Sequence, residues 1–155
     1  MALKKLLKFH KFAFAWENYL LLARAIRAAL LARRSLLENT PSQRFPSSLD
    51  AVNRMYLPPQ PGWKISDPEK IALFASFVIN FPIAWGRCVQ QSLITYRLLN
   101  GYGIPAKICF GVSRNEPTET GHAWIVTSNE PDRAFAEQSD PRAKFKLVYT
   151  SPLPH

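Results

Sequence analysis

A cysteine at a predicted helix start and a histidine on a predicted strand constrain the fold of this chain more than any other feature. Cys88 follows Gly86-Arg87 and begins a helical pattern, and His122 begins the apolar run 122–126. Unpaired N–H groups and the positive dipole end at a helix start favour the thiolate, and so would the Arg87 cation. A strand histidine facing that thiol would complete a nucleophilic Cys–His pair. The rest of the chain is therefore expected to bring the two side chains together.

Helices are predicted before the sheet. Leu, Ala, Arg and Lys dominate residues 3–37, which contain no Gly or Pro, so a long helical region is expected there. Residues 66–69, Ser-Asp-Pro-Glu, are typical of a helix start and predict a mostly apolar helix over 70–79. A short helix is expected around 49–55, and the cysteine-bearing helix should end at the Asn-Gly pair 100–101.

Strands are predicted in the last third of the chain. The expected strands cover residues 106–112, 122–128, 134–137 and 145–150. A turn at 129–132 would make the second and third strands a hairpin. Helices followed by a small antiparallel sheet predict the α+β class, with a helix-borne cysteine packed on the sheet.

Length and charge bound the domain organisation. A chain of 155 residues is large enough for one core but not for two, so 1–155 is expected to be a single domain. Its formal charge of +9 is uneven, because residues 1–45 hold nine Lys or Arg against Glu17 and Glu38. We expect a basic helical region at 1–45 and a nearly neutral catalytic core at 63–155, so the charge concerns partners.

The basic region has two compatible explanations. In the first, its amphipathic helices pack on the core and leave a solvated basic face. One helix side would gather Tyr19, Leu22, Ile26, Ala29, Leu30 and Leu37, and another side Arg24, Arg27 and Arg34. In the second, the region contacts an anionic membrane or a partner protein. The residues suited to that role are Lys4, Lys5, Lys8 and Lys11 beside Leu6, Leu7, Phe9, Phe12 and Phe14. Nucleic acid is not an expected partner, because no binding motif accompanies the charge.

Cysteine usage favours a reducing compartment. Cys88 and Cys109 are the only cysteines, so a disulfide framework is excluded and the cytoplasm is the expected location, with the inner face of the membrane as a candidate contact. Two cysteines and three scattered histidines lack ligand spacing, so neither a metal site nor a cofactor is expected. No stretch is long enough to span a bilayer, and no small-residue cleavage site follows the basic start, which we expect to be retained.

Each candidate site residue also has a structural explanation. A free cysteine such as Cys88 is often only a small buried hydrophobe, and Cys109, among Ile108 and Phe110, is expected to be one. His122 could be a structural strand histidine beside Trp124. His10 and His155 lie in a charged helix and at the terminus, so neither is expected in the site.

A third residue should hold the imidazole in the right tautomer. It should come from the strand paired with the His122 strand, and Glu137 at the end of residues 133–137 fits best. Asp140 and Asp132, both in predicted turns, are the alternatives. The backbone N–H of Cys88 at the helix start is the expected oxyanion donor, and no second donor is identified.

These residues resemble one family closely. The resemblance is carried by Arg-Cys-Val-Gln-Gln-Ser-Leu at 87–93, Leu-Leu-Asn-Gly-Tyr-Gly-Ile-Pro-Ala at 98–106, Phe-Gly-Val at 110–112 and Gly-His-Ala-Trp at 121–124. Together they are similar to the transglutaminase-like cysteine peptidases of lasso-peptide biosynthesis, in the stand-alone form that lacks a leader-recognition domain. In that family the third residue is an acid, commonly Asp, about a dozen residues after the histidine. Glu137 stands slightly further along.

The resemblance implies a specific reaction and specific partners. Cys88 would attack the carbonyl of the last leader residue of a ribosomally made precursor, with His122 as general base and then acid. A separate leader-recognition protein would present the precursor, and an ATP-dependent macrolactam synthetase would use the freed amine. Two other hypotheses stay open: a general transglutaminase-like peptidase or amidase, and a non-catalytic membrane-associated adaptor.

Overall fold

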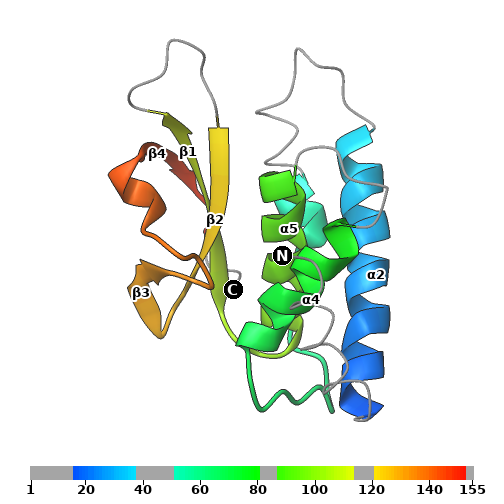
Figure 1. Ribbon diagram of the computed structural model, residues 1–155. Helices are drawn as coiled ribbons and strands as arrows, with labels where there is room; N and C mark the ends of the chain where they lie inside the picture. The colour runs from blue at the N-terminus through cyan, green and yellow to red at the C-terminus, as the bar shows by residue number, and fades with distance from the viewer. Residues whose placement is uncertain (1–15, 38–50, 81–86, 114–120, 153–155) are drawn as a thin grey trace.

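The computed structural model describes residues 16–37, 51–80, 87–113 and 121–152, and within them helices lie beside a small sheet (Figure 1). The helices are α2 (Trp16–Leu37), α4 (Glu69–Ile79) and α5 (Arg87–Gly101), with a further helical segment at 51–55. The strands are β1 (Ala106–Ser113), β2 (Gly121–Thr127), β3 (Glu130–Ala134) and β4 (Phe145–Thr150). The short 3₁₀ helix η2 (Pro141–Ala143) precedes β4. This arrangement confirms the predicted α+β class and the order of helices before strands.

The four strands form an antiparallel sheet in the order β3-β2-β1-β4. β1 and β2 pair along their length, from Ala106 opposite Thr127 to Val112 opposite Gly121. β3 follows β2 through a tight turn and pairs only with Val126 and Thr127 of β2 in the described residues. The first half of β2 therefore keeps an edge that no described strand covers.

The main core fills the space between the helices and one face of the sheet. α5 packs on β1 and β2, while α2 packs on α4 and α5, so α5 stands between α2 and the sheet (Figure 1). The largest side chains that are fully buried here include Phe74, Met55, Ile71, Leu93, Ile94, Leu98, Leu99 and Ile108. A second, smaller cluster of Cys109, Trp124 and Ala134 lies on the opposite face of the sheet.

The helix predicted after Ser66-Asp67-Pro68-Glu69 forms as α4 and begins at Glu69. The carboxylate of Asp67 accepts a hydrogen bond from the Glu69 backbone N–H, which satisfies one donor of the first turn. The described part of the short helix expected around 49–55 also forms, at 51–55. Residues 3–15 of the predicted long helix lie outside the described residues.

The buried side of α2 differs from the expected one. Leu21, Ala25, Ala28 and Ala32 are almost completely buried, whereas Tyr19, Ile26 and Leu30 are exposed. This side of α2 faces α4 and α5, and its small alanine side chains suit close helix packing. Among the described residues, no helix has both the length and the apolar character needed to cross a bilayer.

The hairpin partner of β2 also lies earlier than expected. β3 covers Glu130–Ala134, so the predicted strand 134–137 is wrong, as is most of the predicted turn at 129–132. A two-residue turn at Ser128 and Asn129 is enough to reverse the chain, which moves the pairing toward the turn.

Gly111 allows the two central strands to pack against β4, and replacing it by alanine should destabilise the protein. A Cβ at this position would lie 2.9 Å from Trp124 Cζ3 and 3.0 Å from both the Lys146 carbonyl oxygen and Phe145 Cβ. We expect Gly111→Ala to lower the free energy of unfolding by about 1–3 kcal/mol in urea titrations. Gly121→Ala is the matched control, because its Cβ would lie at an ordinary van der Waals distance of 3.7 Å from the Gly111 carbonyl oxygen, the nearest atom among the described residues. Equal stability of the two variants would contradict this packing argument.

Candidate active site

Cys88 and His122 lie at the same end of the molecule, in the first turn of α5 and at the start of β2 (Figure 1). Cys88 is half-buried. A side-chain hydrogen bond with His122 lowers the pKa of Cys88, although burial opposes the shift. Backbone hydrogen bonds with Ala123 and Val89 lower this pKa further, so the N–H groups act as donors to the sulfur. The side chain of Arg87, expected to favour the thiolate, lies outside the described residues.

The imidazole of His122 contacts both the thiol and a carboxylate. Its hydrogen bond with Cys88, and then that with Glu137, raise the pKa of His122 to about 9 against the opposing effect of burial. His122 Nε2 lies 3.4 Å from Glu137 Oε1, which leaves Nδ1 as the nitrogen for the sulfur. With the pKa of the thiol lowered and that of the imidazole raised, the pair is favoured as thiolate and imidazolium near neutral pH.

Two aromatic rings fix the plane of the His122 ring. The ring stacks on Phe145 of β4 at a centroid distance of 5.0 Å and an interplanar angle of 25°. Trp124 lies on the same face of β2, with centroids 6.1 Å apart and planes at 18°. Because the neighbouring Gly111 has no side chain, the rings can approach each other across the sheet. The sequence did not single out Phe145 for this contact.

Glu137 reaches His122 from a turn and not from a strand. After β3, the Phe135 N–H donates to the Ile125 carbonyl oxygen at 2.8 Å, and Ala136 then takes a left-handed φ of 57°. A residue with a Cβ adopts this conformation at a cost, and here the bend directs the next residue back toward β2. The expectation that Glu137 lies at the His122 ring is therefore met, but its expected place on a strand is not.

The two alternative acids are engaged elsewhere. The Asp140 carboxylate accepts from Arg142 Nε at 2.9 Å and from the Arg142 backbone N–H at 3.0 Å, and these bonds lower the pKa of Asp140. Arg142 also donates to the backbone carbonyl of Asp132. Arg142 thus joins the two ends of the segment that carries Glu137, and neither alternative acid contacts His122 in the described structure.

Side chains of α5 cover the part of the β2 edge that β3 leaves open. The Ser92 hydroxyl donates to the Ala123 carbonyl oxygen at 2.9 Å in a buried position, and the Ala123 N–H bonds the Cys88 sulfur. Cys88 and Ser92 are one helical turn apart, so they lie on the same side of α5. The helix thereby takes the place of a pairing strand and sets the distance from sulfur to imidazole. The four-residue spacing of Cys88 and Ser92 is visible in the sequence, but no local signal there indicates that Ser92 contacts β2.

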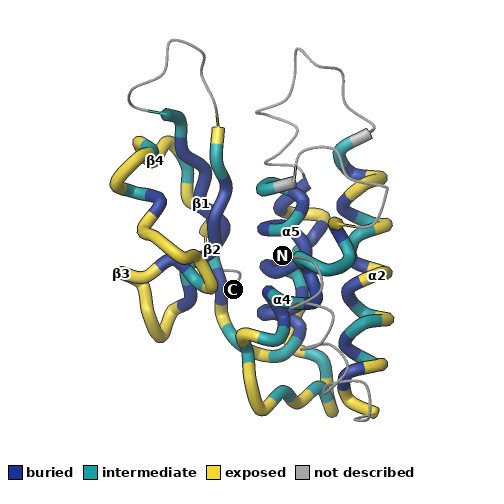
Figure 2. The backbone as a smooth tube through the Cα atoms, viewed as in Figure 1, coloured by how far each residue is buried: buried dark blue, intermediate teal, exposed yellow. Residues whose placement is uncertain are grey.

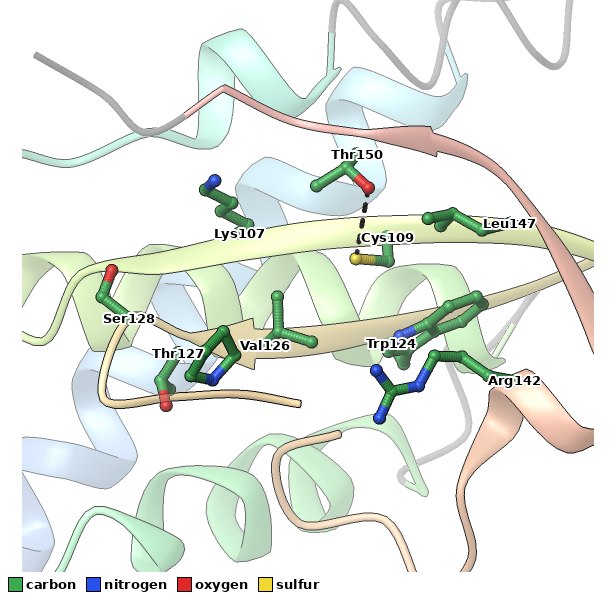
Figure 3. A pocket seen from close by; sticks show the side chains of 10 residues that line it. Lys107, Cys109, Trp124, Val126, Thr127, Ser128, Arg142, Leu147 and Thr150 are labelled. Atoms are coloured by element: carbon green, nitrogen blue, oxygen red, sulfur yellow. Dashed lines mark hydrogen bonds between the residues drawn. The ribbon is translucent and has the colours of Figure 1, made fainter. Parts of the chain in front are cut away.

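Cys109 lies on the face of the sheet that is turned away from the helices. It lines a pocket of about 390 Å³ together with Trp124, Leu147 and Arg142 (Figure 3). Burial raises the pKa of Cys109, and its sulfur lies 3.6 Å from the Thr150 hydroxyl. The expectation of a buried, structural cysteine is confirmed.

The arrangement supplies a nucleophile, a proton carrier and an orienting carboxylate, the components of covalent acyl transfer. No cluster of three His, Cys, Asp or Glu side chains in the described part of the chain could hold a metal ion. Of the three histidines, His122 lies within the residues that the structure describes, and His10 and His155 lie outside them.

Comparison with known proteins gives one family match. A family model described as the transglutaminase-like superfamily matches residues 14–150, which include all of the described helices and strands. No curated protein and no solved structure matches the chain.

The lowered thiol pKa predicts selective alkylation of Cys88. With a limiting thiol reagent at pH about 6, where an ordinary thiol of pKa near 8.5 is almost wholly protonated, mass mapping should find rapid labelling at Cys88 and slow labelling at Cys109. His122→Ala should move the midpoint of the Cys88 rate profile to higher pH, because the hydrogen bond that lowers this pKa is lost. Equal rates at the two cysteines, or an unmoved midpoint, would contradict the coupled pair.

Loss of the Ser92 hydroxyl should weaken both the fold and the site. Ser92→Ala leaves the buried Ala123 carbonyl without this donor, so we expect the free energy of unfolding to fall by about 1–3 kcal/mol. Cys88 alkylation at pH about 6 should also slow, because the helix is no longer fixed to the β2 edge. Ser128→Ala is the control, since Ser128 is exposed in the turn after β2. A stability loss without any change in alkylation would limit Ser92 to a structural role.

Proposed function

Because the chain belongs to the transglutaminase-like superfamily, we propose that it is a cysteine peptidase that removes the leader peptide from a ribosomally made lasso-peptide precursor. The superfamily includes cysteine peptidases, so the match supports the class of enzyme. The substrate is proposed from the sequence stretches at 87–93, 98–106, 110–112 and 121–124, which resemble the leader peptidases of that pathway.

The observation that carries the proposal is the position of the His122 ring between a thiol and a carboxylate. His122 Nε2 is 3.4 Å from Glu137, and the other side of the ring hydrogen-bonds Cys88. A structural strand histidine would need only one of these partners. The raised pKa of His122, about 9, suits a group that must hold a proton while the thiolate attacks.

In the proposed reaction, the Cys88 thiolate attacks the carbonyl carbon of the last leader residue. A new C–S bond forms, and the negative charge moves to the carbonyl oxygen, where the Cys88 backbone N–H at the start of α5 is the proposed donor. His122 then gives its proton to the amide nitrogen as the C–N bond breaks. The core peptide leaves with a free amino group, and the leader remains as a thioester on Cys88.

The second half returns the enzyme to its starting state. His122, now neutral, takes a proton from a water molecule that attacks the thioester carbonyl. The C–S bond breaks, the leader leaves as a carboxylic acid, and the thiolate and imidazolium are restored. Glu137, in contact with His122 Nε2, stabilises the imidazolium.

The proposal includes partners and a location. A separate leader-recognition protein would deliver the precursor, because the resemblance is to the stand-alone form of these peptidases. The freed amine would be the nucleophile for an ATP-dependent macrolactam synthetase. We propose the cytoplasm as the location, where precursor synthesis and a free thiol are compatible.

Two outcomes would redirect the assignment. Partner-free hydrolysis of unrelated peptides at comparable rates would favour a general transglutaminase-like peptidase or amidase. Retention of biological function by Cys88→Ala would favour an adaptor whose helical surface and not its thiol is used.

Leader cleavage should depend on all three site residues in a graded way. With a lasso-peptide precursor and a leader-recognition protein added, mass spectrometry should detect no cleavage for Cys88→Ala and a rate about 10²–10⁴-fold lower for His122→Ala. Glu137→Gln should cost on the order of tenfold, since one pKa unit of lost imidazolium stabilisation is about 1.4 kcal/mol.

The pH profile separates an electrostatic role of Glu137 from a structural one. Cleavage by the wild type should fall as the pH rises through about 9, because His122 then loses the proton that the leaving amine needs. Glu137→Gln should shift this alkaline limb to lower pH, since its hydrogen bond raises the pKa of His122. Glu130→Gln is the matched control and should leave the limb unmoved, because the Glu130 carboxylate pairs with Arg133 at the surface. A shift in Glu130→Gln but not in Glu137→Gln would overturn the assignment.

A further inference from the structure

The outer side of α2 exposes a line of large apolar side chains. The exposed fractions are 73% for Trp16, 56% for Tyr19, 45% for Ile26 and 58% for Leu30. Ala23 is exposed in line with them, as is Arg33. We call Trp16, Tyr19, Ala23, Ile26, Leu30 and Arg33 the α2 stripe. Figure 2 shows exposed positions recurring along α2, whose opposite side is buried against the other helices.

The spacing of the α2 stripe is that of a helix-packing seam. Its six positions alternate steps of three and four residues, which is the repeat that keeps one line of side chains against a partner helix. With a rise of 1.5 Å per residue, the stripe from Trp16 to Arg33 is ~26 Å long. Isolated exposed apolar residues need no explanation, but a continuous line of this length marks an interaction site.

Positive charge accompanies the stripe. α2 carries four arginines and one acid, Glu17. Arg24 is engaged within the protein, because it donates to the Tyr102 hydroxyl at 2.7 Å and lies 3.9 Å over the Trp63 ring. Arg27 is exposed beside the stripe. Burial lowers the pKa of Arg97 on α5, and repulsion from Arg27 lowers it further. An acidic partner would relieve this repulsion.

We propose that the α2 stripe docks an amphipathic helix of a partner protein, with acidic residues flanking the apolar seam of that helix. The spacing selects a helix as the occupant, and the arginines select its charge. Residues 1–15 of this chain fit less well, because they hold four lysines and no acid. A second copy of the chain would bring the same excess of arginine. Since α5 stands between α2 and the sheet, a partner on the outer side of α2 would lie across the helical layer from the strand that carries His122 (Figure 1).

The test uses the full-length protein and two synthetic helices of about 21 residues, or three heptads. Both carry Ile and Leu at the seam positions, one with Glu and the other with Lys at the flanking positions. Fluorescence anisotropy should show tighter binding of the Glu peptide. Ile26→Ser combined with Leu30→Ser should weaken it about tenfold or more, since two apolar contacts are lost. Arg27→Glu should weaken binding of the Glu peptide and strengthen binding of the Lys peptide. Misfolding of the variant cannot produce this reversal.

Two exposed apolar residues of the sheet serve as the control for non-specific hydrophobic binding. Leu147 and Val148 of β4 are 46% and 45% exposed, close to Ile26, so Leu147→Ser with Val148→Ser should leave peptide binding unchanged. Equal loss in both double variants, or equal binding of the two peptides, would overturn the proposal. The proposal would also be overturned if the wild type sedimented as a dimer and the Ile26→Ser, Leu30→Ser variant sedimented as a monomer. That result would assign the α2 stripe to self-association. Binding to anionic phospholipid vesicles through Ile26 and Leu30, without peptide binding, would assign it to a membrane instead.

Discussion

The contact between the first two turns of α5 and the open edge of β2 determines the geometry of the candidate site. An exposed strand edge has N–H and C=O groups that need partners, and β3 is too short to satisfy those of Ala123 in the described structure. α5 supplies the partners from side chains, a hydroxyl from Ser92 and a sulfur from Cys88. The same edge is satisfied further along by backbone, where the Phe135 N–H bonds the Ile125 carbonyl. The hydrogen bonds that complete the sheet are thus also those that position the nucleophile.

Electrostatic coupling then gives this contact its chemistry. A thiol at a helix start gains some thiolate character from the dipole alone, but the largest cause of the lowered Cys88 pKa is the imidazole. The imidazole in turn holds its proton because sulfur and carboxylate both hydrogen-bond it. Each of the three groups therefore stabilises the charged form of its neighbour, so removal of one changes the others. The rings of Phe145 and Trp124 contribute by restricting the plane in which His122 can exchange that proton.

The helical layer separates two surfaces with different physical character. At the end where α5 begins, partly buried polar groups meet in a small volume, which suits chemistry. On α2, an apolar line with arginines beside it lies on the side facing away from the sheet, which suits recognition of a helix. The side of α2 that packs on the other helices carries mainly alanines, and its larger apolar side chains lie on the opposite, exposed side.

The sequence by itself determined the α+β class, most helix and strand positions, the pairing of Cys88 with His122 and the structural role of Cys109. These depend on local signals: caps, turn residues, apolar runs and a thiol placed at a helix start. Tertiary structure alone decided which side of α2 is buried, since apolar residues lie on both sides of the helix. It also brought Glu137 to the His122 ring, after the left-handed Ala136, while Asp140 and Asp132 contact Arg142. Ser92 and Phe145 became visible only when α5 and β4 were placed against β2, since contacts between distant segments leave no local pattern in the chain.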